Sequence, residues 1–189
     1  MAEYYLISQL PSLDGLNDSV PLPITEEYFI EMCEKLLKDK AIKELKNLTL
    51  IPPLIPEKSK SSLVMAWNNG ERYLRLAIAK IRADKMGKAF DLQNEILPNE
   101  YLKIANNALE IDNPLEAEKF LMEYRLKFLE SLRPMDSFSE EFIYYYYLRL
   151  KLLKRMRKFS VEEGKITYKN IYNSIINGNK TEAMQWPKI

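Results

Sequence analysis

Residues 113–134 read NPLEAEKFLMEYRLKFLESLRP and contain the clearest helix signals in the chain. Asn113 suits a helix cap, Pro114 suits the first helical position, and Glu116 follows the cap by three residues. Because Pro134 cannot continue a helix, we expect this one to end near Leu132. Its apolar residues form two stripes, one at 117, 120, 124, 128 and 132 and one at 115, 122, 126 and 129. Two apolar faces indicate a helix packed between others in a bundle.

The same signals predict five more helices on either side. In chain order they cover about 25–39, 61–86, a shorter stretch that starts at Pro98, 139–159 and about 161–177. The first of them can resume through 45. Gly70 lies on the apolar stripe of the second of these, where we expect another backbone to come close. Gly87 is the predicted stop of that helix. The fold class predicted is therefore all-α, a bundle of about six helices with an irregular N-terminal segment.

The N-terminal part of the chain is predicted to be less regular. Prolines and Gly15 divide residues 1–24 into turns, and Tyr4-Tyr5-Leu6-Ile7 has the composition of a short strand. Three prolines make residues 49–56 a stiff connector. We therefore expect an irregular N-terminal segment with one helix over 1–60, a helical bundle over 61–178 and a loose tail over 179–189.

Composition excludes several classes of function. The 189 residues hold 28 Lys and Arg against 27 Asp and Glu, so the net charge of +1 indicates no particular partner. There is no histidine, and the single cysteine, Cys33, can build neither a disulfide within the chain nor a thiolate metal cage. The five glycines are too far apart for a phosphate-binding or dinucleotide-binding loop. We therefore expect no cofactor and no metal.

A basic stripe near the end of the 139–159 helix is the first candidate contact surface. Lys151, Lys154, Arg155 and Lys158 are spaced i, i+3, i+4 and i+7, and Tyr144 and Tyr147 precede them on the same stripe. A solvated basic helix end explains this pattern. A contact with an acidic protein surface explains it as well, and so does a nucleic-acid site in which the tyrosines stack on bases.

Three other arginines also have two interpretations. Arg72 and Arg75 lie one turn apart on the long helix. They are either scattered solvated charges or a pair that binds a partner's carboxylate through bidentate hydrogen bonds. Arg149 falls on an apolar face, where an unpaired charge is very costly. We expect it to pair with a carboxylate of this chain at 110, 112 or 118, or with a partner protein.

Nothing in the chain predicts catalysis. The acid pairs at 26–27, 140–141 and 162–163 all fall where helices begin, which the helix dipole explains. Cys33 sits on an apolar helix face, so we expect it in the core rather than as a nucleophile.

Four stretches resemble an uncharacterised bacterial family that is encoded among V-type ATPase genes. They are YYLISQLP at 4–11, NGERYLRLAIAKIRADKMG at 69–87, NPLEAEKFLMEY at 113–124, and the segment 138–164, which begins FSEEFIYYYYLRLKLLKR and ends FSVEEG. That family is distantly similar to the C subunit of V-type ATPases, the eukaryotic d subunit, which is the protein that receives the stalk. The stalk-receiving protein is all-α, is built of three-helix modules, and sits on the membrane rotor ring, where it receives the central stalk.

The resemblance implies a non-catalytic accessory or linker subunit that docks onto stalk or rotor subunits of a V-type ATPase during ion transport. Lys151, Lys154, Arg155 and Lys158 are the expected contacts, with Arg72 and Arg75 second. The alternative is a helical RNA- or DNA-binding module that uses the same stripe, although overall neutrality makes nucleic acid the weaker choice. The free cysteine and the lack of a signal peptide favour a cytoplasmic location. Since no uncharged run exceeds ten residues, membrane contact is expected only through partners, and no small-molecule substrate is expected.

Overall fold

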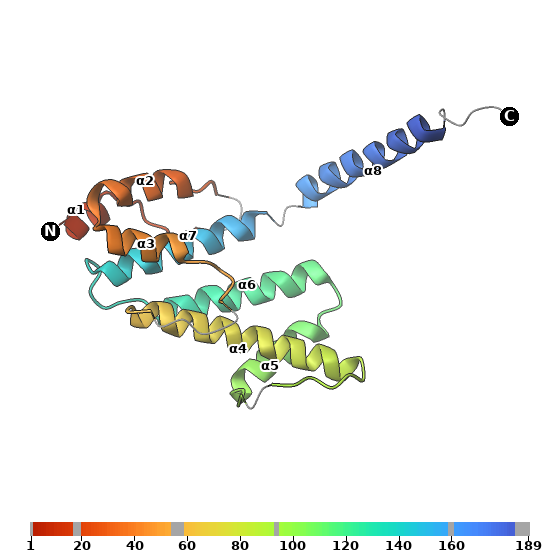
Figure 1. The fold of residues 1–189 in the computed structure, drawn as a ribbon, viewed down its shortest axis with the longest axis horizontal. Coiled ribbons are helices and arrows are strands. Elements are labelled where there is room, and N and C mark those ends of the chain that lie inside the picture. The colour runs from red at the N-terminus through yellow and green to blue at the C-terminus, as the bar shows by residue number, and fades with distance from the viewer. Residues whose placement is uncertain (1, 17–19, 54–58, 93–94, 159–160, 184–189) are drawn as a thin grey trace. The chain divides into compact units, whose positions relative to one another are not determined.

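Eight helices form the part of the chain that the computed structural model describes, residues 2–16, 20–53, 59–92, 95–158 and 161–183 (Figure 1). They are α1 (Ala2–Gln9), α2 (Glu26–Leu36), α3 (Asp39–Asn47), α4 (Ser62–Lys85), α5 (Asn99–Glu110), α6 (Pro114–Ser131), α7 (Glu140–Arg157) and α8 (Val161–Ala183). No strand occurs in these residues, and the predicted all-α class is confirmed. The prediction of about six helices was two too few.

The N-terminal segment is helical, and the suggestion of a strand over Tyr4–Ile7 was wrong. These residues lie in α1, and the described part of residues 1–60 holds three helices instead of the one expected. An isolated strand leaves its backbone groups unpaired, whereas a helix pairs them within itself. Because the described residues contain no second strand to pair with, a helix is favoured over Tyr4–Ile7. Leu6 of α1 is fully buried, and the Tyr146 hydroxyl donates to the Pro11 carbonyl at 2.8 Å. The segment is therefore part of the bundle core.

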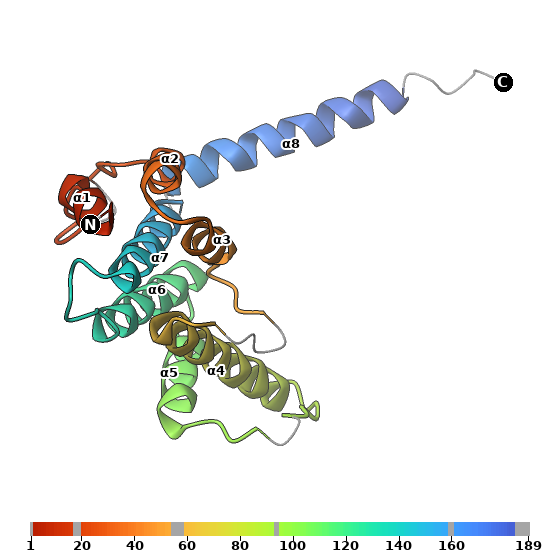
Figure 2. The ribbon, with the colours of Figure 1, turned by 60° about the vertical axis from the view of Figure 1, so that its left-hand side comes forward.

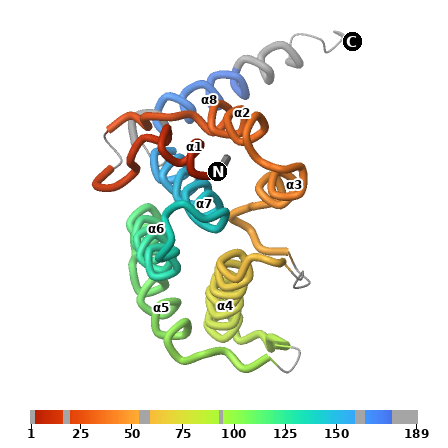
Figure 3. Tube along the Cα trace, turned by 90° about the vertical axis from the view of Figure 1, so that its left-hand side faces the viewer, coloured from red at the N-terminus to blue at the C-terminus, as the bar shows by residue number. Residues whose placement is uncertain are grey.

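Helix α7 is the central element of residues 1–156. Figure 3 shows it between α2 and α3 on one side and α4 and α6 on the other. Nine of its residues are buried, including all four consecutive tyrosines 144–147. Consecutive helical residues point about 100° apart, so this run covers the whole circumference of the helix. Phe29 of α2 stacks on the rings of Tyr146 and Tyr147 at centroid distances of 5.4 and 5.3 Å.

A second core lies between α4, α5 and α6, and Figure 2 shows these three helices together. It contains Leu74, Ala77, Ile81, Leu97, Tyr101, Ala105, Ala108 and Leu121. Gly70 faces this region, and a Cβ placed on it would lie 2.3 Å from the Phe128 ring. The close neighbour predicted for Gly70 exists, but it is an aromatic side chain and not a backbone.

The helix boundaries follow the predicted caps. The side chain of Thr25 accepts from the Tyr28 amide, that of Ser61 from the Val64 amide and that of Asn113 from the Leu115 amide. Past the end of α4, Gly87 has φ of +64°, the left-handed conformation that glycine adopts without strain. These local signals fix where α2, α4 and α6 begin and where α4 ends.

Two compact units make up the chain, residues 1–156 and residues 157–189. The bundle predicted over 61–178 spans this boundary, and the first unit includes the N-terminal helices that we had placed outside the bundle. The second unit contains α8, which extends past Asn179, where the loose tail was expected, to Ala183. The rest of that tail lies outside the described residues.

Candidate functional site in the charged helix faces

Lys151 of the predicted basic stripe is held inside residues 1–156. Its ammonium donates to the Leu48 carbonyl at 2.6 Å and lies 3.6 Å from a Glu26 oxygen. It also lies 4.4 Å from the centre of the Tyr147 ring, a cation–π contact. Burial lowers the pKa of Lys151, and the Glu26 carboxylate partly opposes that effect. This lysine ties α7 to the residues around α2 and α3.

Lys154 connects the same two parts of the bundle. Its ammonium lies 2.9 Å from a Glu26 oxygen and 3.4 Å from a Glu27 oxygen, both in the first turn of α2. Burial acts to raise the pKa of Glu26, but hydrogen bonds from Lys154 and Tyr147, together with the charges of Lys151 and Lys154, outweigh it and hold the pKa below its usual range. The hydrogen bond to Glu26 in turn raises the pKa of Lys154. Glu26 is therefore an ionised link between α2 and α7.

The other two members of the stripe are separated from these lysines. Arg155 donates to Glu118 of α6 at 2.9 Å and therefore contacts a different helix from the two lysines. Lys158 is exposed and belongs to residues 157–189. The predicted four-residue contact surface is thus divided among two intramolecular linkages and one exposed lysine.

The tyrosines that a nucleic-acid site would need are buried. Tyr144 is 1% exposed and Tyr147 is 4% exposed. Their hydroxyls donate to Glu140 at 2.6 Å and to Glu26 at 2.9 Å. Burial, reinforced by these carboxylates, raises the pKa of both phenols. Neither ring is available to stack on a base.

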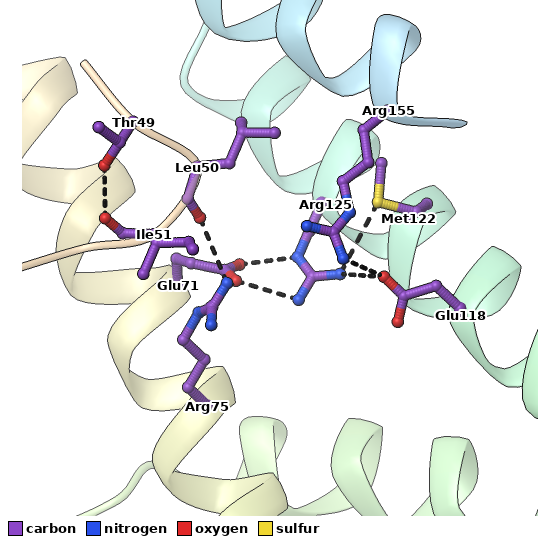
Figure 4. Close-up of polar contacts among 9 residues, drawn as sticks. All are labelled: Thr49, Leu50, Ile51, Glu71, Arg75, Glu118, Met122, Arg125 and Arg155. Atoms are coloured by element: carbon purple, nitrogen blue, oxygen red, sulfur yellow. Dashed lines mark hydrogen bonds and ion pairs between the residues drawn. The ribbon is translucent and has the colours of Figure 1, made fainter. Parts of the chain in front are cut away.

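A buried ion pair between α4 and α6 is the centre of a larger charged network (Figure 4). Glu71 is 2% exposed and Arg125 is 9% exposed. The Arg125 Nε donates to Glu71 Oε2 at 2.9 Å, and Nη2 donates to Oε1 at 3.0 Å. This is the bidentate fork that makes an arginine–carboxylate pair strong and directional.

The network continues on both sides of this pair. On α4, Arg75 Nε donates to Glu71 Oε1 at 2.9 Å and Arg75 Nη2 contacts the Leu50 carbonyl at 3.5 Å. Towards α7, Glu118 lies 3.9 Å from Arg125 and accepts from Arg155. Figure 4 shows the resulting chain of contacts from the loop at Leu50 through α4 and α6 to α7. Three guanidiniums and two carboxylates thus connect four segments.

Arg72 and Arg75, the second predicted contact, do not act together. Arg75 is part of the network, whereas Arg72 forms an ion pair with Glu95, which precedes α5. Both side chains are at least partly buried in contacts of this chain. The predicted bidentate grip on a partner's carboxylate is instead directed at carboxylates within the bundle.

Arg149 is paired within the chain, as one of the two interpretations predicted, but none of the named carboxylates is its partner. It pairs with Glu130 at the end of α6 and lies 3.1 Å from Asp14. Because α6 and α7 run antiparallel, the last turn of α6 lies beside the middle of α7. Glu118, near the start of α6, reaches Arg155 instead. The predicted partner of Arg149 was wrong because the true partner depends on the relative direction of α6 and α7, which helical periodicity does not encode.

Glu71 and Arg125 were missed by the sequence reasoning, although a signal was present. Glu71 falls on the stripe of α4 that carries Trp67 and Leu74, and Arg125 falls between Met122 and Leu129 on one stripe of α6. Opposite charges at core positions of two helices indicate a buried pair, because each charge alone would be very costly.

The carboxylates around one surface hollow also have structural roles. This hollow, of about 260 Å³, is lined by Lys38, Lys40, Ala41, Glu44, Lys60, Ser61, Glu140, Glu141 and Tyr144. Glu141 accepts from the Ser62 amide at 2.9 Å and from both hydroxyls at 61 and 62, which caps α4. Glu44 accepts from Ser59, and Glu140 accepts from Tyr144. The acid pairs at 26–27 and 140–141 lie in first helical turns, as predicted.

Cys33 is fully buried, in agreement with the prediction that it belongs to the core. Burial, with a smaller contribution from Glu34, raises the pKa of its thiol to about 12. Burial therefore disfavours the thiolate, which is the nucleophilic form of cysteine. Over the described ranges, no group of three acidic, cysteine or histidine side chains is placed to hold a metal ion.

Helix α8 presents a different kind of surface. Tyr168, Ile171, Tyr172 and Ile175 are each more than half exposed, at 68, 55, 52 and 58%. Their spacing of i, i+3, i+4 and i+7 places them on one face of the helix, an arrangement that we call the α8 stripe. Large apolar side chains on one exposed helix face are typical of a docking surface.

Residues 75–179 match a family described as "Protein of unknown function (DUF2764)", and this match covers more than half of the chain. The chain belongs to this family. Its description names no activity and no partner, so the expected association with a V-type ATPase stays a prediction. No curated protein and no solved structure matches the chain. The matched region runs from the middle of α4 into α8 and contains the whole of α6 and α7.

Proposed function

We propose that this member of the DUF2764 family is a non-catalytic accessory subunit of a V-type ATPase that acts by docking onto protein partners. The observation that carries the docking role is the contrast between the two units. In residues 1–156 the candidate contact charges form ion pairs with other residues of the chain. In α8 the large apolar side chains are exposed.

A helical bundle whose helices are joined by ion pairs suits a linker subunit in a machine that transmits force. The ion pairs of Lys154 with α2, of Arg125 with α4 and of Arg155 with α6 join α7 to α2, α6 to α4 and α7 to α6. Such pairs fix the relative position of helices when several of them form one network. A bundle of this kind keeps its shape while a separate element makes the contact.

The association with a V-type ATPase rests on the resemblance of the four stretches quoted above. Three of them form long helical segments of the structure, over α4, α6 and α7. The all-α fold is consistent with the helical modules of the stalk-receiving protein. Among the described residues, none of the helices combines the length and the apolar character that crossing a bilayer requires. Under this proposal, contact with the membrane sector is made through its protein subunits.

Affinity co-purification tests the proposal. The tagged full chain is recovered from native membranes and from cytosol at two salt concentrations, and the co-purified proteins are identified by mass spectrometry. Recovery of stalk or rotor subunits of the ATPase at both salt concentrations is the expected result. Recovery of no ATPase subunit, with nucleic acid retained at low salt instead, would contradict it and favour the nucleic-acid alternative.

A further inference from the structure

The α8 stripe has a defined geometry for meeting another helix. Tyr168, Ile171, Tyr172 and Ile175 span two turns, and the rings of Tyr168 and Tyr172 stack at a centroid distance of 6.1 Å. Residues at this spacing form the seam of paired helices, where each side chain inserts between those of the neighbour. A straight apolar seam of this kind fits a helix better than it fits a flat surface.

The charges beside the stripe lie on one side of it. At about 100° per residue, Lys165 and Lys169 fall roughly 60° and 100° round the helix from Tyr168, in the same direction. Thr167 and Ser174 border the other side. Both lysines are exposed, and residues 164–176 contain no Asp or Glu. Over residues 164–176 the stripe is therefore apolar along its centre, positive along one edge and uncharged along the other.

We infer that the α8 stripe docks onto an amphipathic helix of a partner protein whose apolar seam carries Asp or Glu along the edge that meets Lys165 and Lys169. The inference deepens the proposed docking function and rests on it. Apolar contact supplies the association, and the lysine edge selects the partner and its orientation.

Two other occupants fit the charges less well. A second copy of α8 paired in register with the stripe meets Lys165 and Lys169 with residues 164–176, which contain no carboxylate, because the three glutamates of α8 lie at its two ends. An anionic membrane would attract an excess of basic residues, but the sequence of α8 holds three lysines and three glutamates. A partner helix with an acidic edge satisfies both the seam and the lysines.

Defined peptide probes test this inference on the full chain. One synthetic helix carries a leucine seam flanked by glutamates, and a second carries the same seam flanked by lysines. We expect the glutamate-flanked peptide to bind about tenfold more tightly, since exposed charge pairs contribute modestly and additively along an edge. The variant Lys165→Glu with Lys169→Glu should reverse this preference.

A matched pair of variants separates the stripe from the rest of the helix. Ile171→Asp places a charge in the seam and should abolish peptide binding. Asn170→Asp introduces the same aspartate one position earlier, on the opposite face of α8, and should leave peptide binding unchanged. Circular dichroism of both variants reports whether the helix content is preserved.

Several outcomes would overturn the inference. These are equal binding of the two peptides, an unchanged preference in the double lysine variant, self-association that Ile171→Asp removes, and binding to phosphatidylserine-containing vesicles that Ile171→Asp removes. The last two would assign the stripe to a second copy or to a membrane. If ATPase subunits co-purify while the peptides fail, the docking function stands and only the partner chemistry of α8 is wrong.

Discussion

Glu71 is a carboxylate on a helix face that otherwise packs Trp67 and Leu74, and it is tolerated there because two guanidiniums meet it. Arg125 supplies a bidentate contact from α6, and Arg75 adds a third hydrogen bond from α4. Removing one partner of a buried pair leaves the other charge in a poorly solvated place, which costs more than the pair itself contributes. The network therefore makes residues 1–156 sensitive to single substitutions.

Replacement of Glu71 tests this cost. Glu71→Ala leaves Arg125 with Glu118 at 3.9 Å as its remaining ion-pair partner, and we expect the free energy of unfolding to fall by about 3–5 kcal/mol. The control is Glu34→Ala, which removes an exposed ion pair with Lys46 and should cost at most about 1 kcal/mol. Urea denaturation measures both. Equal effects of the two substitutions would mean that the buried network adds nothing to stability.

Gly70 offers a steric test of the packing between α4 and α6. A Cβ at this position would lie 2.3 and 2.4 Å from two atoms of the Phe128 ring, which stacks between Trp67 and Tyr124. Alanine favours a helix over glycine by about 1 kcal/mol, but the displaced ring should outweigh this, with a net loss of about 1–3 kcal/mol for Gly70→Ala. Gly164→Ala in α8, where the Cβ meets nothing, is the control. Urea denaturation measures both variants, and a stabilised Gly70→Ala protein would show that the ring is not held in place.

The ionised state of Glu26 predicts a dependence on pH. Its pKa in the fold is below the ordinary value of 4.5, so its ion pairs contribute fully above that pH. Their contribution is lost as the pH falls through the folded-state pKa. We expect the free energy of unfolding to decrease as the pH falls below about 5, and to decrease less steeply in Glu26→Gln. Urea titrations at a series of pH values measure this, and parallel curves for the two proteins would argue against the role of Glu26.

At the scale of helices, local signals account for what could be predicted. The caps at Thr25 and Asn113 and the stop at Gly87 act over a few residues, so the boundaries that depend on them were correct. The partners of Arg149 and the Glu71–Arg125 pair depend on how helices lie against each other, which no local pattern contains. The basic stripe of α7 was a correct observation on the sequence, but its charges meet carboxylates from α2 and α6 that lie far away along the chain.

Helix α1 was the element that the sequence reasoning described least well, and its attachment to the bundle can be measured. Leu6 is fully buried, whereas its neighbour Tyr5 is 58% exposed. Leu6→Ala should lower the free energy of unfolding by about 2–3 kcal/mol, and Tyr5→Ala by less than about 0.5 kcal/mol. Chemical denaturation compares the two. A negligible effect of Leu6→Ala would mean that α1 is not part of the core.

At the scale of the whole molecule, the chain separates two tasks. Residues 1–156 use their charged side chains to join helices, and α8 in residues 157–189 exposes its apolar side chains. Cys33, Tyr144 and Tyr147 are buried and belong to the core. A nucleophilic site would need the cysteine to be accessible, and a nucleic-acid site would need the tyrosines to be accessible. Under the proposed function, this division favours partner contact through α8 over contact through the basic stripe of α7.

Cross-linking of the native assembly with an amine-reactive reagent tests that assignment most directly. The full chain is cross-linked in native membranes, and the linked peptides are identified by mass spectrometry. We predict links from Lys165 and Lys169 of α8 to V-type ATPase stalk or rotor subunits, and no partner links from Lys151, whose ammonium is held by Leu48 and Glu26. Partner links concentrated on Lys151 and Lys154, with Lys165 and Lys169 joined to no ATPase subunit, would contradict the account.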